Sequence, residues 1–151
     1  MRFHFRLLGC LLLAIPLSET FSGLERIALA SAEPMEWRIA PRKASQQNPY
    51  AADKSSLALG QWLYQRECLS CHGVTGKGDG PAAAELERSA GDLSSQATGR
   101  QSDGELFWKI TLGRKPMPSF KTLITNEERW HVVNYLRTLS RTAPEAKRSA
   151  R

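Results

Sequence analysis

The feature that most constrains this chain is the pentapeptide Cys68-Leu69-Ser70-Cys71-His72. Two cysteines three positions apart lie on one side of a helical turn, so both sulfurs can form thioethers with two substituents on one edge of a single porphyrin. The next residue, His72, can then place an imidazole nitrogen on the iron. This spacing is that of the c-type haem attachment motif. It predicts one covalently bound haem c, attached through Cys68 and Cys71, with His72 as an iron ligand.

Three other interpretations of the two cysteines stay open: a redox-active pair of the thioredoxin type, half of a zinc site, and two cysteines without chemistry. The redox pair belongs to a strand–helix unit, and a zinc site needs two more ligands. The chain has no second Cys-x-x-Cys, and beyond residue 32 its only other histidine is His131. His131 is expected on the last helix in a solvated or packed role, so the haem interpretation is favoured.

The sixth iron ligand is predicted to be Met117. A thioether opposite histidine raises the potential of a haem couple. Pro116 and Pro118 flank Met117 and restrict the backbone that would carry it. The alternative is that Met117 only fills a gap in the core, as methionines often do. Met35 is the rival ligand, and it lies in an irregular segment with nothing comparable to fix it.

Residues 1–32 are predicted to be a signal peptide or an N-terminal anchor. Arg2 and Arg6 precede an apolar run, residues 7–17, and small residues at 28–32 offer cleavage sites. The apolar run is shorter than the roughly 18 residues that span a bilayer. A periplasmic or otherwise extracytoplasmic location, or association with a membrane, is therefore expected.

The overall charge of the chain indicates its partners. With 21 Lys and Arg against 15 Asp and Glu, the net charge is +6, which can steer the protein towards an acidic redox partner or an anionic membrane surface. Basic residues are scattered among acidic ones instead of forming a stripe, so nucleic acid is not an expected partner.

Four helices and no strand are predicted. The first begins at a cap, Asp53 or Ser55, and runs into Cys68; the second follows Pro81 over residues 82–88. The other two begin at capping boxes, residues 102–105 and 125–128. Gly113 is expected to end the third helix.

The predicted organisation has four parts. They are residues 1–32, the leader; 33–54, an extended arm; 55–140, the haem domain; and 141–151, a disordered basic tail.

The glycine-rich segment 76–80 resembles a phosphate loop only superficially, because it lacks Gly-Lys-Ser/Thr and a preceding strand. Its glycines are expected to let the backbone pass close to the haem edge. We also expect a carbonyl near Gly80 or Pro81 to accept a hydrogen bond from His72.

Residues 60–139 resemble class I c-type cytochromes in the order Gly60, Tyr64, the haem motif, Met117-Pro118 and Tyr135. The resemblance implies a mostly α, small cytochrome c fold, with about four helices around one covalently attached haem. It implies that the glycine and tyrosine of the first helix pack on Tyr135 and Val132 of the last.

The same resemblance implies axial ligation by His72 and Met117 and a role as an electron carrier, not an enzyme. Donor and acceptor would be redox partner proteins. Two alternatives remain: a ligand-binding, sensing or peroxidase haem protein with an open sixth position, and a structural subunit with a vestigial haem.

The arm and the segment 76–81 are also similar to mono-haem subunits of respiratory complexes or periplasmic dehydrogenases. This similarity implies that the arm wraps a partner subunit and not its own haem domain.

Overall fold

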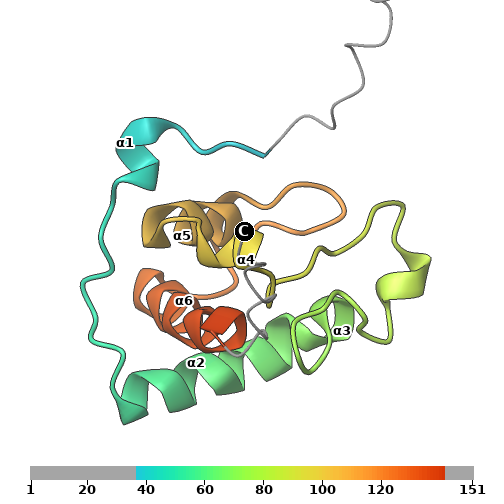
Figure 1. Ribbon diagram of the computed structural model, residues 1–151, viewed down its shortest axis with the longest axis horizontal. Coiled ribbons are helices and arrows are strands. Elements are labelled where there is room, and N and C mark those ends of the chain that lie inside the picture. Colours follow the sequence, from blue (N-terminus) through green and yellow to red (C-terminus); the bar gives the residue numbers. More distant parts are fainter. Residues whose placement is uncertain (1–36, 142–151) are drawn as a thin grey trace, which may run out of the picture. The chain divides into compact units, whose positions relative to one another are not determined.

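The computed structural model describes residues 37–141, which are mostly helical. The predicted leader, Met35 and all of the predicted tail except residue 141 lie outside them. The helices, shown in Figure 1, are α1 (Pro41–Ala44), α2 (Lys54–Glu67), α3 (Leu69–His72), the 3-10 turn η1 (Ala83–Glu85), α4 (Gln96–Gly99), α5 (Asp103–Leu112) and α6 (Asn126–Arg141). The described residues form no strand beyond one isolated bridge, Arg114 to Met117. None of their helices has the length and apolar character needed to cross a membrane.

The helix starts predicted from capping residues are confirmed. The side chain of Asp53 accepts a hydrogen bond from the backbone N–H of Ser56 at 2.8 Å, so α2 begins at Lys54. Ser102 and Glu105 form a reciprocal capping box at α5. Satisfying the free N–H groups of a first turn in this way fixes where a helix begins.

A second capping box starts α6. The backbone N–H of Thr125 donates to the carboxylate of Glu128 at 2.7 Å, and the N–H of Glu128 donates to the Thr125 hydroxyl at 3.2 Å. Gly113, with φ +63°, ends α5 as predicted. The three long helices of the fold therefore have the starts that their sequence predicts.

The helices α2 and α6 cross at Gly60. A Cβ atom at this position would lie 2.1 Å from the backbone oxygen of His131, so only glycine allows this approach. One turn further along α2, the ring of Tyr64 packs on that of Tyr135 with 5.2 Å between their centroids. The contact with Tyr135 implied by the family resemblance is confirmed.

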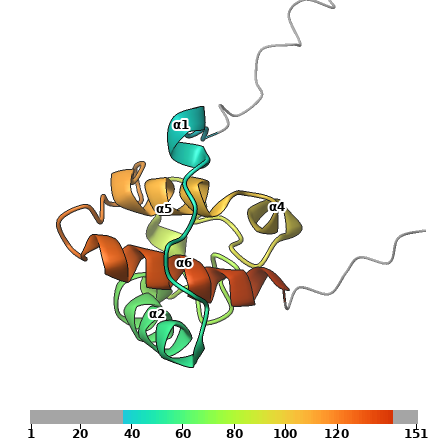
Figure 2. The same ribbon diagram turned by 90° about the vertical axis from the view of Figure 1, so that its left-hand side faces the viewer.

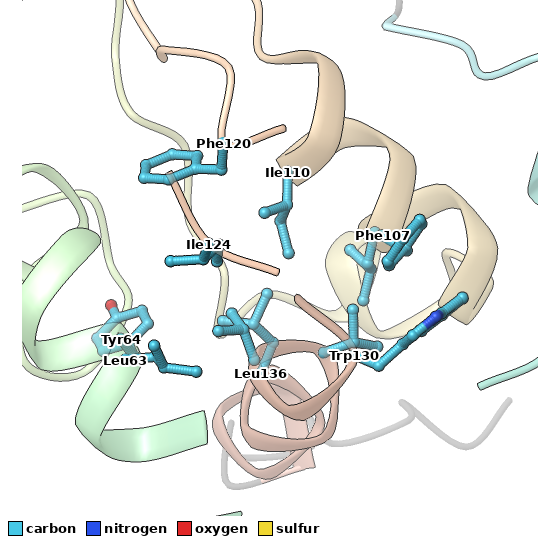
Figure 3. Packing of buried hydrophobic residues seen from close by; sticks show 11 residues of the cluster. Leu63, Tyr64, Phe107, Ile110, Phe120, Ile124, Trp130 and Leu136 are labelled. Carbon is cyan, nitrogen blue, oxygen red and sulfur yellow. The ribbon is translucent and has the colours of Figure 1, made fainter. Parts of the chain in front are cut away.

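The core lies between α2, α5, α6 and the segment before α6. Figure 3 shows side chains from these elements pointing towards one another, and the rings of Phe107 and Trp130 stack at 4.0 Å. The buried members are Leu63, Tyr64, Leu106, Phe107, Ile110, Phe120, Ile124, Trp130, Val132, Val133 and Leu136.

The described part of the arm, residues 37–53, differs from the prediction in two ways. It contains the helical turn α1, which starts at Pro41, a residue whose fixed φ suits a first helical position. It also packs on its own domain: the hydroxyl of Ser102 donates to the carbonyl of Ala44 at 2.6 Å, and Asn48 donates to the carbonyl of Trp130 at 3.1 Å. Figure 2 shows this teal segment running across α5 and α6 to the start of α2.

The expectation that the arm does not contact its own haem domain is therefore wrong for residues 44–48, whereas wrapping of a partner subunit stays a prediction. The arm's polar side chains find their hydrogen-bond partners on the helices of the same chain.

The predicted helix over 82–88 is wrong in extent. Only the 3-10 turn η1 forms after Pro81, and Leu86 has left the helical region with ψ 133°. No residue of η1 is buried, so no tertiary packing stabilises a longer helix here. The short helix α4, capped by Ser95, was not predicted.

Candidate haem site

The two cysteines of the motif lie on a single helical turn. Cys68 ends α2 and precedes α3, and its own N–H still donates to the carbonyl of Tyr64 at 2.9 Å. Its carbonyl accepts from the N–H of Cys71 at 3.2 Å and of His72 at 2.9 Å. Both thiols are free and half-buried. The structure therefore brings Cys68, Cys71 and His72 together in one turn.

Cys68 lies in an apolar environment. Its side chain packs against the core cluster. Desolvation, followed by the negative charges of Glu67 and Cys71, raises the pKa of the Cys68 thiol to about 12.

His72 has a buried nitrogen without a partner. Its Nδ1 atom is buried and makes no hydrogen bond, which is rare for a polar atom inside a protein. Burial lowers the pKa of His72, and an interaction with the backbone of Gly91 opposes that effect. The expected bond to a carbonyl near Gly80 or Pro81 is therefore absent.

The glycine-rich loop folds back on the motif. The N–H of Gly78 donates to the carbonyl of His72 at 2.9 Å, and that of Gly80 to the carbonyl of Cys71 at 3.2 Å. A Cβ atom at Gly80 would lie 2.4 Å from the backbone oxygen of Ser70. The glycines thus allow the loop to approach closely, and what it approaches in the structure is the backbone of α3.

Tyr64 secures the residue that follows the histidine. Its hydroxyl donates to the buried carbonyl of Gly73 at 2.6 Å. Gly73 itself has φ +75°, and a Cβ there would meet the carboxylate of Asp79 at 2.0 Å. The chain therefore turns sharply after His72 and is held in that turn from α2.

Met117 sits on a loop with a narrow base. A Cβ atom at Gly113 would lie 2.3 Å from the backbone oxygen of Pro118, so the two ends of the loop touch. The N–H of Met117 donates to the carbonyl of Arg114 at 2.9 Å. Met117 is half-buried and packs against the core cluster on which Cys68 also packs. In Figure 1 this loop, in orange, and α3 lie on the right-hand side of the domain.

These residues fit a covalently attached haem. They supply two free thiols on one turn, an imidazole whose second nitrogen is buried, and a thioether on an anchored loop. Among residues 37–141, no group of three or more His, Cys, Asp or Glu side chains forms a metal site. His131 takes a packed role instead: its Nδ1 lies 2.7 Å from the hydroxyl of buried Ser56.

Arg129 was not predicted to have a role; it is buried on α6 and donates to three backbone carbonyls after the Met117 loop. Nothing in the sequence distinguishes this arginine from those on exposed faces, because its partners are main-chain atoms.

Comparison with known proteins identifies the family. The cytochrome c family model matches residues 57–140, which is more than half of the 151-residue chain. The chain belongs to the cytochrome c family. Its cofactor is therefore a covalently bound haem c with iron, and the chemistry of the family is haem-based electron transfer.

Solved structures give more distant similarities. One is a chain of the Kuenenia stuttgartiensis reducing HAO-like protein complex Kustc0457/Kustc0458, with 30% identity and a TM-score of 0.54 over 60% of this chain and 46% of that chain. Another is the KustC0563 c-type cytochrome, with 28% identity and a TM-score of 0.47 over 53% of this chain and 95% of that chain. The chain thus spans about half the length of the first of them. No curated protein sequence matches it.

Proposed function

We propose that this protein is a one-electron carrier whose single haem c is attached through Cys68 and Cys71 and ligated by His72 and Met117. The observation that carries the proposal is the single turn that holds both free thiols and the imidazole with a buried, unpartnered Nδ1. When bound, haem would supply one-electron iron chemistry, and ligation by the thioether of Met117 together with His72 would raise its potential.

The chain's own residues would keep the iron environment fixed. Tyr64 holds the turn after His72, and the narrow base at Gly113 holds the loop of Met117. Such rigidity favours electron transfer, because ligands that do not move between oxidation states keep the reorganisation energy of each transfer low. Met117 in the sixth position also excludes small ligands, so the protein would not be an enzyme by itself.

The partners would be other redox proteins outside the cytoplasm. The net charge of +6 favours acidic partner surfaces. One similar solved chain comes from a protein complex, which supports membership of a complex for this chain too. Under this proposal the chain passes electrons between a dehydrogenase or respiratory complex and a terminal acceptor.

Two methionine substitutions test the ligand set. In Met117→Ala, haem should stay attached, the reduction potential should fall, and the reduced protein should bind carbon monoxide. The matched control is Met35→Ala, which should leave the potential and the spectrum unchanged. The measurements are absorption spectra of both oxidation states and a potentiometric titration.

Each other outcome has a defined meaning. An unchanged spectrum in Met117→Ala would show that Met117 is not an iron ligand. Carbon monoxide binding in Met35→Ala would show that Met35 is the ligand. Carbon monoxide binding by the unsubstituted protein would favour a sensing or ligand-binding haem protein.

A further inference from the structure

Arg129 is a buried arginine without an acidic partner. It lies on α6 with only 4% of its surface exposed. No carboxylate within residues 37–141 contacts its guanidinium group, and its Nε is buried without a hydrogen bond. A buried positive charge needs polar partners to offset its lost hydration, so the groups that surround it indicate its role.

Most of those partners are backbone carbonyls of one short segment, and the ring of Phe107 on α5 lies 5.2 Å from the guanidinium. Nη1 of Arg129 donates to the carbonyls of Phe120 at 3.1 Å, Lys121 at 3.2 Å and Ile124 at 2.6 Å. Nη2 donates to the side chain of Asn126. All three carbonyls lie in residues 120–124, which join the Met117 loop to α6, so a single side chain binds α6 to the end of that loop.

The same end of the loop is also attached to α5. The hydroxyl of Ser119 donates to the carbonyl of Thr111 at 2.7 Å, and the N–H of Phe120 donates to the carbonyl of Ile110 at 3.2 Å. Phe120 therefore bonds to α5 through its N–H and to Arg129 through its carbonyl. It lies three residues after Met117, so the two attachments meet next to the proposed ligand.

We propose that Arg129 is a positioning residue that sets how firmly Met117 occupies the sixth position of the haem iron. This inference rests on the proposed function. If Met117 ligates the iron, an external ligand would have to replace it, and moving Met117 away would strain the segment that Arg129 holds. Charge-assisted hydrogen bonds from one guanidinium to several carbonyls make that segment hard to move. A lysine would keep the charge but not the planar set of donors.

The test is a titration of the ferric holoprotein with imidazole, followed by absorption. Arg129→Met should bind imidazole about tenfold more tightly, the equivalent of ~1.4 kcal/mol and of one charge-assisted hydrogen bond. Arg129→Lys should lie between this variant and the unsubstituted protein. Denaturant unfolding of each variant records its global stability separately.

Arg137→Met is the matched control. Arg137 also lies on α6 and donates to backbone carbonyls, those of Gly99 and Gln101, and it pairs with Asp103. None of these partners belongs to the Met117 loop. The control should lose stability without binding imidazole more tightly.

Unchanged imidazole affinity in Arg129→Met, or an equal gain in Arg137→Met, would overturn the inference. If Arg129→Met does not fold, Arg129→Lys decides: lower stability with unchanged imidazole affinity would overturn it too. A failure of the proposed function shows separately, because the unsubstituted reduced protein would then bind carbon monoxide.

Discussion

Gly60 leaves room at the point where α2 crosses α6. In Gly60→Ala the new Cβ would meet the backbone of His131 and not a movable side chain. We expect the holoprotein to lose about 3 kcal/mol of unfolding free energy, at the upper end of overpacking costs. The measurement is unfolding by denaturant.

Gly99→Ala is the control for this prediction. The nearest atom to a Cβ at Gly99 is 3.6 Å away, an ordinary contact, so this change should be neutral or slightly stabilising. Equal losses in the two variants would show that the close approach at Gly60 is not the cause.

The hydroxyl of Tyr64 makes a second contact that a single substitution can test. Burial raises the pKa of Tyr64 well above its ordinary value, so the hydroxyl stays a donor to the carbonyl of Gly73. Tyr64→Phe keeps the ring but removes the stronger of two hydrogen bonds to the Gly73 carbonyl, which then accepts only from the N–H of Gly76 at 3.3 Å. The expected cost is about 1 kcal/mol. Tyr135→Phe, in which no such bond is removed, should cost less. Thermal unfolding of both holoproteins would compare them, and a larger loss for Tyr135→Phe would contradict the account.

At this scale the sequence predicts the residues whose chemistry depends on spacing along the chain. Cys68, Cys71 and His72 are such residues, because their geometry arises within one helical turn. Arg129 is not, since its partners are carbonyls whose convergence depends on the folded loop. Placing its guanidinium required the tertiary structure.

At the scale of elements, the arm acts as a strap on its own domain. The amide of Asn48 donates to the carbonyl of Trp130 and to the side chain of Asn134, both on α6. Asn48→Ala should loosen the arm and speed cleavage by trypsin after Arg42 and Lys43 several-fold. The rate of cleavage in the native holoprotein is the measurement.

Gln47→Ala is the matched control, because Gln47 is exposed and next to Asn48. It should be cleaved at the rate of the unsubstituted protein. Rapid cleavage of the unsubstituted arm would show that it does not rest on the domain in solution, and would favour the partner-wrapping role.

The carboxylate that caps α2 predicts that the protein becomes less stable at acidic pH. Hydrogen bonds from the backbone N–H of Ser56, and then from the hydroxyl of Ser55, hold the pKa of Asp53 below its ordinary value of 3.8. A carboxyl whose pKa is lower in the folded state stabilises the fold above the unfolded-state pKa and ceases to do so as the pH falls through the folded-state pKa.

Asp53→Asn tests this dependence. Asparagine also caps helices well, so α2 should persist. The unfolding midpoint of the variant should fall less steeply than that of the unsubstituted protein as the pH drops below about 4. Urea unfolding across that range is the measurement, and equal slopes in the two proteins would contradict the role of this carboxylate.

Elements were predictable where a local signal marks them. The caps at Asp53, Ser102 and Thr125 and the terminating Gly113 marked the three long helices. The turns α1, η1 and α4 are only three or four residues long, so they depend on packing and loop closure instead of on a sequence period.

At the scale of the whole molecule, residues far apart in sequence complete one domain. The arm reaches α6 through Asn48, α2 reaches α6 through Gly60, and α5 is joined to α6 by Arg137 and Asp103. The sequence indicated the fold class and its helical content. It did not indicate where the arm goes, because the arm's polar residues carry no period and its partners lie 58 to 86 residues away in the sequence.

The most direct test of the account is the absorption spectrum of the reduced holoprotein with and without carbon monoxide. With His72 and Met117 both on the iron, we expect sharp reduced bands that carbon monoxide leaves unchanged. A carbon monoxide-induced shift would mean that the sixth position is open. It would contradict ligation by Met117 and with it the proposed role as a simple electron carrier.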